Sequence, residues 1–411
     1  MSLPIHAPES VGFNAKRLER IKPAMQKYVD QVGFAGVSSL LARRGKVIHF
    51  EQVGWQDREA QVPLAPDTIY RIYSMTKPII CTALMTLYEE GKFQLFEPVM
   101  KYIPAFARTK VYSEGGEQEQ RRPMQIRDLF TYSAGLTYDF LEDSPVGELY
   151  RQARPISNAD NSLEQAVREL ARLPLAYQPG SRWHYSVGID VLAQLIQVIS
   201  GQPLQDFLAE RLFRPLGMVD TAFYVPDAKQ SRLSAMYGHP DIIEPGMTFG
   251  KLFQAWLKHD NQRRNVESTY PSNSLQFARG GHGLYSTAAD YLRFAQMLLS
   301  GRSEDGQRIL GRRTLQLMHS NHLPPALLPY ELNGIPSLGY GFGLGSRVLM
   351  NVAQSALVGS VGEFGWAGAA KTYYWVDPVE EIVGVLMTQY MVAFDLPDKD
   401  FQLLAYQALE D

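Results

Sequence analysis

Ser74 and Lys77 stand three residues apart in the stretch RIYSMTKPII, residues 71–80. On a helix, residues at this spacing share one face, with a rise of about 4.5 Å between their Cα atoms. Burial disfavours the charged form of a lysine, and a neutral amine can take the proton of a serine hydroxyl during attack on a carbonyl. The spacing is therefore typical of an activated nucleophile, although an ordinary helix start or a solvated lysine gives the same letters.

Pro78 limits where the helix that carries these residues can begin. Proline has no backbone N–H and is tolerated only in the first helical turn, so the helix must start close to Ser74. Because a residue before proline disfavours helical dihedrals, either Lys77 absorbs strain or the helix proper begins at Pro78. In both cases the free N–H groups of the helix mouth lie where an oxyanion would form. No G-x-S-x-G motif offers a different serine nucleophile.

The elements around this motif change character along the chain. Residues 14–31 have the spacing of an amphipathic helix, and residues 35–55 predict a β-hairpin whose turn contains Gly45. The middle of the chain is mostly helical, and the segment 238–283 has little periodicity, which is typical of a loop-rich lid or pocket wall. The clearest predicted helices span residues 78–91, 162–173, 188–201 and 287–301.

The composition changes again near residue 338, where glycine, aromatic and β-branched residues predict three strands, in 338–350, 362–378 and 380–390, before a last helix in 398–411. Strands at both ends and helices between them predict an α+β fold. We expect one antiparallel sheet, flanked by helices and built from residues 1–75 and 330–411, with a mostly helical domain, 76–329, inserted between its strands.

Bulk properties exclude several classes of protein. With 411 residues and a net charge of −3, the chain lacks the excess of Lys and Arg that a nucleic-acid surface needs. It has neither a secretory signal nor a long apolar window, so we expect a soluble, cytoplasmic protein with no membrane span. The single cysteine, Cys81, lies in an apolar helical pattern and is interpreted as core packing. The histidines lack metal-ligand spacing, so neither a metal nor another cofactor is expected.

Six segments occur in the order found in one superfamily: YRIYSMTKPI, LFTYSAGL, PGSRWHYSVGIDVLAQLI, GGHGLYSTAADYLRFAQMLLSG, LGYGFGLG and GWAGAAKTYYWVDP. They resemble the class C β-lactamase and penicillin-binding-protein superfamily, and most closely its esterase branch, the family VIII carboxylesterases. The resemblance covers nearly the whole chain and implies a β-lactamase/transpeptidase-like fold, in agreement with the pattern of elements.

The resemblance also implies roles for individual residues. Ser74 would be the acyl-accepting nucleophile, with Lys77 and Tyr185 as its catalytic partners, and either of the two could be the acylation base. The backbone N–H groups of Ser74 and Ala369 would form the oxyanion hole, and Gly368 would let the substrate approach the backbone.

Two departures from the β-lactamase pattern bear on the substrate. The third β-lactamase element, K-T-G, is absent, and the matching strand carries Trp366 and Gly368 in the W-x-G of the esterases. Val187 takes the position of the asparagine in Y-x-N. Both changes make the pocket more apolar and favour a neutral ester over an anionic lactam or peptide. Lys371, followed by Thr372, is a weaker alternative for the missing lysine.

Other polar and aromatic residues have a structural interpretation beside the functional one. His282 has two interpretations, a residue that borders the pocket or one that shapes a flexible turn, and His184 is interpreted as a pocket-edge or capping residue. Tyr132 and Trp256 could contribute to an aromatic acyl pocket or be simple packing residues. The residues expected at the pocket are thus Trp366, Gly368, Val187, Tyr132 and His282.

The sequence therefore predicts a serine carboxylesterase that hydrolyses small-molecule esters of short acyl chains through a covalent acyl-enzyme on Ser74. Transfer of the acyl group to an alcohol is the first alternative, and β-lactamase or D,D-peptidase activity is the second. A binding scaffold without catalysis is the least favoured interpretation.

Overall fold

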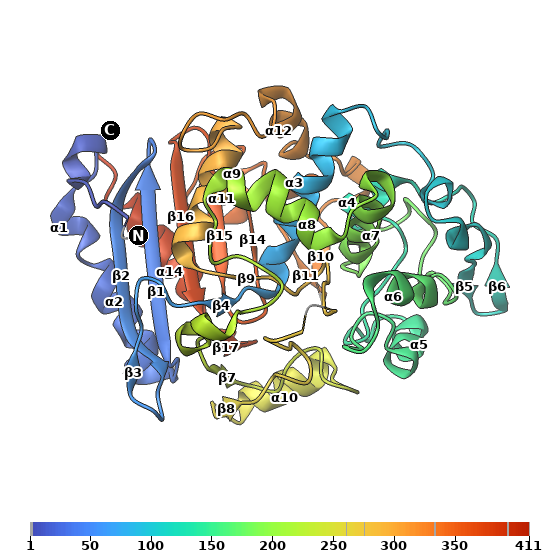
Figure 1. The fold of residues 1–411 in the computed structure, drawn as a ribbon, viewed down its shortest axis with the longest axis horizontal. Helices are drawn as coiled ribbons and strands as arrows, with labels where there is room; N and C mark the ends of the chain where they lie inside the picture. The colour runs from blue at the N-terminus through green and yellow to red at the C-terminus, as the bar shows by residue number, and fades with distance from the viewer. Residues whose placement is uncertain (1–2, 260, 275, 333, 393, 411) are drawn as a thin grey trace.

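A computed structural model describes residues 3–259, 261–274, 276–332, 334–392 and 394–410. Its centre is an eight-stranded sheet in the order β12-β13-β14-β15-β16-β1-β2-β3, and neighbouring strands pair antiparallel. β1 pairs with β16, so the two ends of the chain share one sheet and both termini lie on the same side of the molecule (Figure 1). The predicted α+β fold with an antiparallel sheet from both termini is confirmed.

The first three strands of this sheet are β1 (Gly36–Arg43), β2 (Lys46–Asp57) and β3 (Val62–Pro63). The predicted hairpin is confirmed, and its turn places Arg44 and Gly45 at φ of 50° and 77°. Glycine accepts such a conformation without steric cost, which is why the turn falls here. Every residue of β1 is buried, as expected for a central strand covered on both faces.

The C-terminal part contributes five strands where the sequence predicted three: β12 (Tyr340–Phe342), β13 (Arg347–Leu349), β14 (Phe364–Ala367), β15 (Tyr373–Asp377) and β16 (Ile382–Thr388). Two of the predicted strands, in 338–350 and 362–378, are each a pair of strands joined by a turn. The Gly343 N–H donates to the Ser346 carbonyl, and the Gly368 N–H donates to the Thr372 carbonyl, so tight turns interrupt both segments. The glycines that looked like parts of strands close these turns.

Helices cover both faces of the sheet. Near the termini, α1 (Ala15–Leu18), α2 (Ile21–Lys27) and the last helix, α14 (Pro397–Tyr406), pack on one face, and α11 (Ala288–Ser300) packs on the other against β1, β15 and β16. α11 lies inside the segment 76–329 that the sequence assigned to the inserted domain, yet it is a layer of the sheet. The division into two domains stays a prediction.

The helices predicted over 188–201 and 287–301 have the predicted ends, whereas the helix predicted over 162–173 is shorter. In α11 the Thr287 hydroxyl accepts the Asp290 N–H at 3.1 Å, and Gly301 follows the helix at φ 75°. The predicted helix 188–201 is α7 (Gly188–Ser200), and 162–173 contains α6 (Leu163–Leu170). Caps and periodicity together determine these boundaries.

Of the remaining helices, some lie near the centre of the molecule and others, α4 and α5 among them, lie on the right in Figure 1. They are α3 (Thr76–Glu89), α4 (Ile126–Phe130), α5 (Pro145–Ala153), α8 (Leu204–Leu208), α9 (Arg214–Leu216), α10 (Phe249–Leu257), α12 (Arg312–Met318) and α13 (Val352–Ser355). Small strand pairs join the parts: β4 (Tyr70–Arg71) with β9 (Tyr285–Ser286), and β7 (Met236–Gly238) with β8 (Arg263–Arg264) and β17 (Tyr390–Met391). β5 (Val111–Ser113) with β6 (Gly116–Gln118) and β10 (Glu331–Leu332) with β11 (Ile335–Pro336) are surface hairpins.

The segment 238–283, predicted as a lid or pocket wall, holds α10, the end of β7, β8 and loops; its positions 260 and 275 lie outside the described residues.

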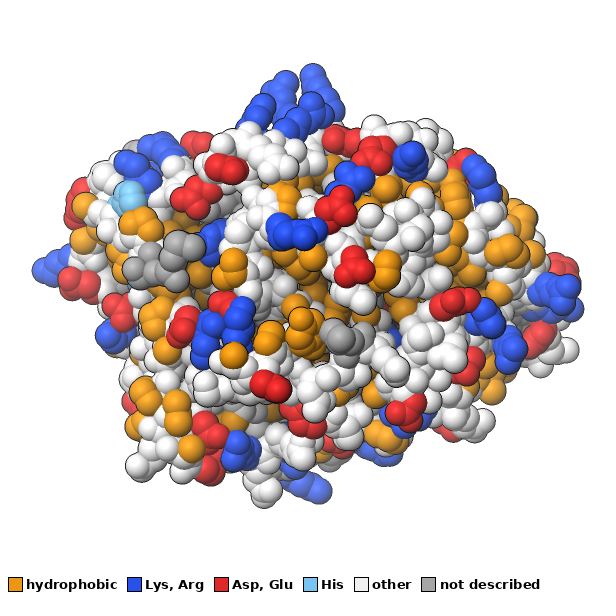
Figure 2. Space-filling view, viewed as in Figure 1, with side chains coloured by type: hydrophobic (Ala, Val, Ile, Leu, Met, Phe, Trp, Pro, Cys, Tyr) orange, Lys and Arg blue, Asp and Glu red, His pale blue; other side chains and the backbone are white. Residues whose placement is uncertain are grey.

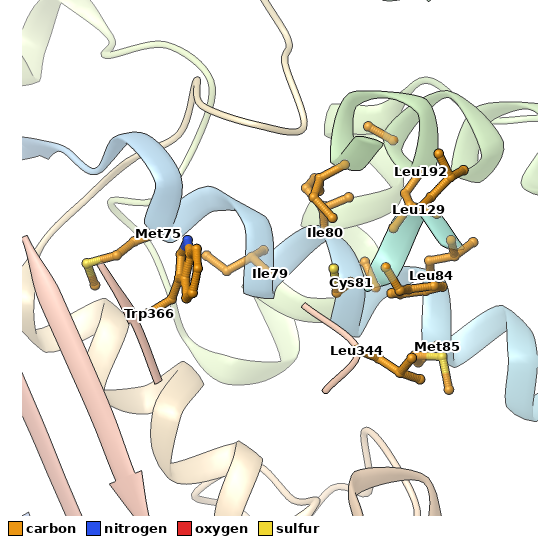
Figure 3. Packing of buried hydrophobic residues seen from close by; sticks show 14 of the residues in the cluster. Met75, Ile79, Ile80, Cys81, Leu84, Met85, Leu129, Leu192, Leu344 and Trp366 are labelled. Carbon is orange, nitrogen blue, oxygen red and sulfur yellow. The ribbon is translucent and has the colours of Figure 1, made fainter. Parts of the chain in front are cut away.

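α3 is the central helix of the core. All residues from Thr76 to Leu87 are buried, and Cys81 is a fully buried packing residue, as predicted. Figure 3 shows Cys81 and Leu84 facing Leu129 of α4, while Trp366 lies beside the first turns of α3. Each fully buried aliphatic side chain of this kind contributes about 1.5–3 kcal/mol relative to an exposed one, so α3 is firmly fixed.

The surface carries mixed charge. Lys and Arg side chains are interspersed with Asp and Glu on the face in Figure 2, apart from a group of Lys and Arg at its top. Among the helices of the described ranges, none combines the length and the apolar character that crossing a bilayer requires.

Candidate active site

Ser74 lies at the junction between the short strand β4 and helix α3. It is the middle residue of a 3-10 turn, Tyr73–Met75, and α3 begins directly after it at Thr76. Lys77 therefore takes helical dihedrals and Pro78 falls within the first turn, which decides between the two helix starts that the sequence left open.

The backbone just before Ser74 is strained. Tyr73 has a φ of 43°, a left-handed conformation that costs a non-glycine residue roughly 1–3 kcal/mol. Neighbouring hydrogen bonds hold it there: the Ile72 N–H donates to the Leu284 carbonyl at 3.1 Å, and the Tyr291 hydroxyl donates to the Met75 carbonyl at 2.9 Å. The turn is thus held on both sides, which fixes the direction of the Ser74 hydroxyl.

The three predicted catalytic side chains meet. Lys77 Nζ donates to Ser74 Oγ at 2.9 Å, and Ser74 Oγ lies 2.8 Å from Tyr185 Oη. Lys77 Nζ also donates to the carbonyl of Gly281. Tyr185 arrives from the loop just before α7, so residues 111 positions apart converge on one hydroxyl. This geometry permits proton transfer to and from Ser74 Oγ.

Two phenol rings enclose the lysine. Lys77 is 1% exposed, and its Nζ lies 5.0 Å from the ring centre of Tyr185 and 5.4 Å from that of Tyr138. Burial raises the pKa of Tyr138 well above its usual value, and Tyr185 and Asp190 add to the effect. Tyr138 is therefore neutral and its ring offers the lysine a cation–π contact.

The loop after β14 faces Ser74. The Gly368 N–H donates to the Thr372 carbonyl at 2.8 Å and the Lys371 N–H to the Gly368 carbonyl at 3.0 Å, which closes a tight turn around Ala369. Within the described ranges, the N–H groups of Ser74 and Ala369 have no hydrogen-bond acceptor. Gly368 is required at this point, because a Cβ there would overlap the Thr372 hydroxyl and the Ile72 carbonyl oxygen.

Ser74, Lys77 and Tyr185 open into a pocket of about 370 Å³. Its walls combine these three residues with the turn after β14 and the loop-rich segment. The other lining residues are Tyr73, Tyr138, Phe140, Ile242, Ile243, Phe249, Gly281, His282, Tyr330, Leu332, Ser337, Arg347, Trp366, Ala367, Gly368, Ala369, Lys371 and Val392.

The five residues predicted for the pocket divide into two groups. Trp366, Gly368 and His282 line it, whereas Tyr132 and Val187 do not, in contrast to the expectation. Tyr132 lies behind the wall, with its ring centre 5.0 Å from that of Tyr185 and 6.4 Å from that of Trp366. Val187 lines a separate cavity of about 10 Å³ beneath Tyr138. Both are packing residues that support the lining.

The structure also locates the three less favoured candidates, His184, Trp256 and Lys371. His184 lies away from the pocket, 2.9 Å from the Thr137 hydroxyl, and burial lowers its pKa to about 4. Trp256 packs on α10 against Phe394, with ring centres 5.0 Å apart. Lys371 lines the pocket wall, and its Nζ lies 3.6 Å from the carboxylate of Asp398.

Sequence reasoning missed three residues that surround the lysine: Tyr138, Gly281 and Asp190. Asp190 is the most informative, because it is a fully buried carboxylate in the first turn of α7. An acidic residue inside the apolar run GIDVLAQLI was the only sequence signal, and an acidic first turn also has a purely structural explanation. The contacts of Tyr138 and Gly281 depend on tertiary structure and left no local pattern.

Comparison with known proteins places the chain in a family. The Beta-lactamase family model matches residues 21–408. Protein Rv1367c of Mycobacterium tuberculosis is 33% identical over 91% of this chain and 90% of its own, and Esterase EstB of Burkholderia gladioli is 29% identical over 93% of both chains. The structure of EstCE1, described as a hydrolase with promiscuous acyltransferase activity, superimposes with a TM-score of 0.78 at 26% identity, over 97% of this chain and 99% of its own.

These matches agree with the resemblance that the sequence motifs indicated, and they extend over nearly the whole length of each partner. The chain belongs to the Beta-lactamase family, in the esterase branch of this superfamily of serine hydrolases.

Proposed function

We propose that this protein is a serine carboxylesterase that hydrolyses esters of short acyl chains through a covalent acyl-enzyme on Ser74. The observation that carries the proposal is the contact of Ser74 Oγ with both Lys77 Nζ, at 2.9 Å, and Tyr185 Oη, at 2.8 Å, inside the pocket. A nucleophile with two proton-transfer partners and free backbone donors opposite is sufficient for acyl transfer.

In the proposed reaction, Ser74 Oγ attacks the ester carbonyl carbon while its proton passes to the Lys77–Tyr185 pair. The N–H groups of Ser74 and Ala369 stabilise the oxyanion. When the tetrahedral intermediate collapses, the bond to the alcohol oxygen breaks and the pair returns the proton to the leaving alkoxide. Water then attacks the acyl-Ser74 ester, gives its proton to the same pair, and Ser74 recovers the proton on release of the acid.

The lining beside the nucleophile supports a neutral ester as substrate. The resemblance of the motifs implies that Trp366 takes the position of the lysine in the K-T-G of β-lactamases. The ring centre of Trp366 lies 5.9 Å from that of Tyr185. An indole there offers packing surface and no positive charge, so an apolar acyl group fits better than a carboxylate. The esterase names of EstB and of the lovastatin esterase of Penicillium rubens support the same substrate class.

A p-nitrophenyl ester series from two to twelve acyl carbons tests the proposal. Wild-type protein is expected to favour the short chains, and Ser74→Ala is expected to lose at least about 10³-fold in kcat. Ser113→Ala, in a distant surface hairpin, is the matched control and should keep full activity. Full activity of Ser74→Ala would contradict the proposal, as would efficient turnover of a chromogenic cephalosporin.

Acyl transfer to an alcohol is the second candidate, because the structure of EstCE1 is described as having promiscuous acyltransferase activity. The same acyl-enzyme would serve both reactions, with an alcohol replacing water as the second nucleophile. Product analysis with an added primary alcohol distinguishes them: hydrolysis gives the free acid, and transfer gives a new ester.

A further inference from the structure

Asp190 is linked to the catalytic lysine through one glycine. Asp190 Oδ1 accepts a hydrogen bond from the Gly281 N–H at 3.0 Å, and the Gly281 carbonyl accepts a hydrogen bond from Lys77 Nζ. The glycine is thus held on one side by the carboxylate and offers its carbonyl to the ammonium on the other. Asp190 follows Tyr185 by five residues, so the element that delivers the catalytic tyrosine also delivers this carboxylate.

The fit around Gly281 leaves no room for adjustment. A Cβ at this position would lie 2.6 Å from Asp190 Oδ2 and 2.8 Å from Tyr138 Oη. The carboxylate of Asp190 and the phenol of Tyr138 therefore leave no room for a side chain at Gly281, the residue whose carbonyl binds Lys77. Asp190 is fully buried, and its Oδ2 has no hydrogen-bond partner in the part of the chain that the structure describes.

Asp190 is also the carboxylate that balances two buried cations. Arg279 donates to the carbonyl oxygens of Ile156, Asn158 and Asn161, and among the described residues neither Arg279 nor Lys77 has a carboxylate within 4 Å. Burial raises the pKa of Asp190, whereas the Gly281 N–H, Lys77 and Arg279 act in the opposite direction. Lys77 and Arg279 thus favour the ionised form of the Asp190 carboxylate and oppose the effect of burial.

Three other titratable groups near Lys77 and Asp190 do not supply a negative charge to the lysine. Burial, followed by Lys77 and Arg279, lowers the pKa of His282 well below its usual value, so this histidine is neutral. Tyr138 is a neutral phenol. Asp139 lines the small cavity behind Tyr138, where its carboxylate accepts the Ser157 hydroxyl at 2.8 Å.

We propose that Asp190 is a positioning residue that decides where the shared proton of the Lys77–Tyr185 pair resides. Its carboxylate fixes Gly281 against the lysine and favours the ammonium form of Lys77, which leaves the negative charge on Tyr185 once the pair has lost one proton. Tyr185 is then the acylation base: the Ser74 proton moves to the Tyr185 oxygen as the Oγ–carbonyl bond forms, and it moves on to the leaving alkoxide as the ester bond breaks. This inference rests on the proposed function and settles the choice of base within it.

The test is the pH dependence of kcat for Asp190→Asn with a short-chain p-nitrophenyl ester. Asparagine keeps an oxygen that can accept the Gly281 N–H and removes only the charge. Without the charge Lys77 loses its proton more easily, so the acidic limb of the profile moves to lower pH by about one unit. The tyrosinate form becomes scarcer, and the maximal kcat falls about tenfold or more.

Asp139→Asn is the matched control, since it neutralises a carboxylate of the same region that contacts neither Lys77 nor Gly281; its acidic limb should stay in place. A loss of kcat in Asp190→Asn with an unmoved limb would show a merely structural role and overturn the proposal. An unchanged kcat, with or without a shifted limb, would overturn it as well.

A measurement on folded wild-type protein covers the case in which Asp190→Asn does not fold. Ultraviolet difference absorbance should show one tyrosinate that forms along the acidic limb and is missing in Tyr185→Phe. Its absence from the wild type would refute Tyr185 as the base. These failures differ from failure of the proposed function, which would appear as activity that survives in Ser74→Ala.

Discussion

The pocket has two walls of different construction. The first, named the catalytic wall after the role proposed for Ser74, is formed by Ser74, Lys77, Tyr185, Trp366 and Gly368. It is carried by the start of α3, the approach to α7 and the end of β14. The loop wall is formed by Ile242, Ile243, Phe249 and Val392, which come from the segment 238–283 and the residues after β17.

The two walls are also fastened differently. Strand pairing, the buried helix α3 and the hydrogen bonds beside Tyr73 restrain the catalytic wall from several directions. The loop wall is linked to it through Asp241, which accepts the hydroxyls of Tyr73 at 3.1 Å and Thr269 at 2.6 Å. Proton transfer requires positions fixed within a few tenths of an ångström, whereas contact with an apolar acyl chain does not. We therefore expect substitutions in the catalytic wall to act on kcat and those in the loop wall on KM.

The largest effect expected from this contrast comes from Gly368→Ala. The new Cβ would overlap the Thr372 hydroxyl and the Ile72 carbonyl, so the turn that carries the Ala369 N–H must shift. Misplacing an oxyanion donor costs about 10²–10³-fold in kcat, and we expect a loss of that order with KM little changed. The measurement is steady-state hydrolysis of p-nitrophenyl butyrate.

Gly115→Ala is the control, because a Cβ there meets no atom within 4 Å. Wild-type kcat in Gly368→Ala would contradict the role of this turn in catalysis.

The catalytic wall was also the part most accessible to sequence reasoning. Ser74, Lys77 and Tyr185 lie in short motifs whose order identifies the superfamily, and their convergence in the structure agrees with that prediction. The paired hairpin and the capped helices follow from local rules that a single stretch of sequence contains.

What the sequence did not reveal depends on contacts between distant segments. Asp190 and Gly281 are 91 positions apart, and nothing local distinguishes this carboxylate from a helix-dipole residue. Tyr132 and Val187 have the residue types of pocket walls, but the folded chain buries both outside the lining of the main pocket. The strand count was wrong for a related reason: glycines suit both a strand beside a ligand and a tight turn, and hydrogen bonds decide between them.

A smaller effect is expected from Phe249→Ala in the loop wall. Phe249 lines the pocket from the first turn of α10. Removing its ring takes away apolar contact worth about 1 kcal/mol to a butyryl ester, which corresponds to a several-fold increase in KM with kcat nearly unchanged. Kinetics with acetyl and butyryl esters measure it, and the longer ester should be affected more.

Phe253→Ala is the matched control from the next turn of the same helix, where the side chain is exposed and does not line the pocket. A large drop in kcat for Phe249→Ala, with KM constant, would show that the loop wall takes part in positioning the reacting groups, and the contrast between the walls would be lost.

The last prediction concerns stability rather than activity: the link between the walls and its dependence on pH. Burial raises the pKa of Asp241 from 3.8 to about 6, although Thr269 and Tyr73 act against the shift. Between these two values the folded state binds more protons at Asp241 than the unfolded chain does. Its contribution to stability is therefore greatest at acidic pH, declines as the pH rises through this window, and stays constant above it.

Asp241→Asn removes this dependence. The stability of the variant relative to that of the wild type should therefore increase by about 2 kcal/mol between pH 4 and pH 7. Urea unfolding at several pH values measures the difference, with the exposed Asp160→Asn as control. A difference that stays flat across the window would mean that Asp241 remains in one protonation state. The strength of the link between the walls would then be independent of pH in this window, because only a titrating group can make it depend on pH.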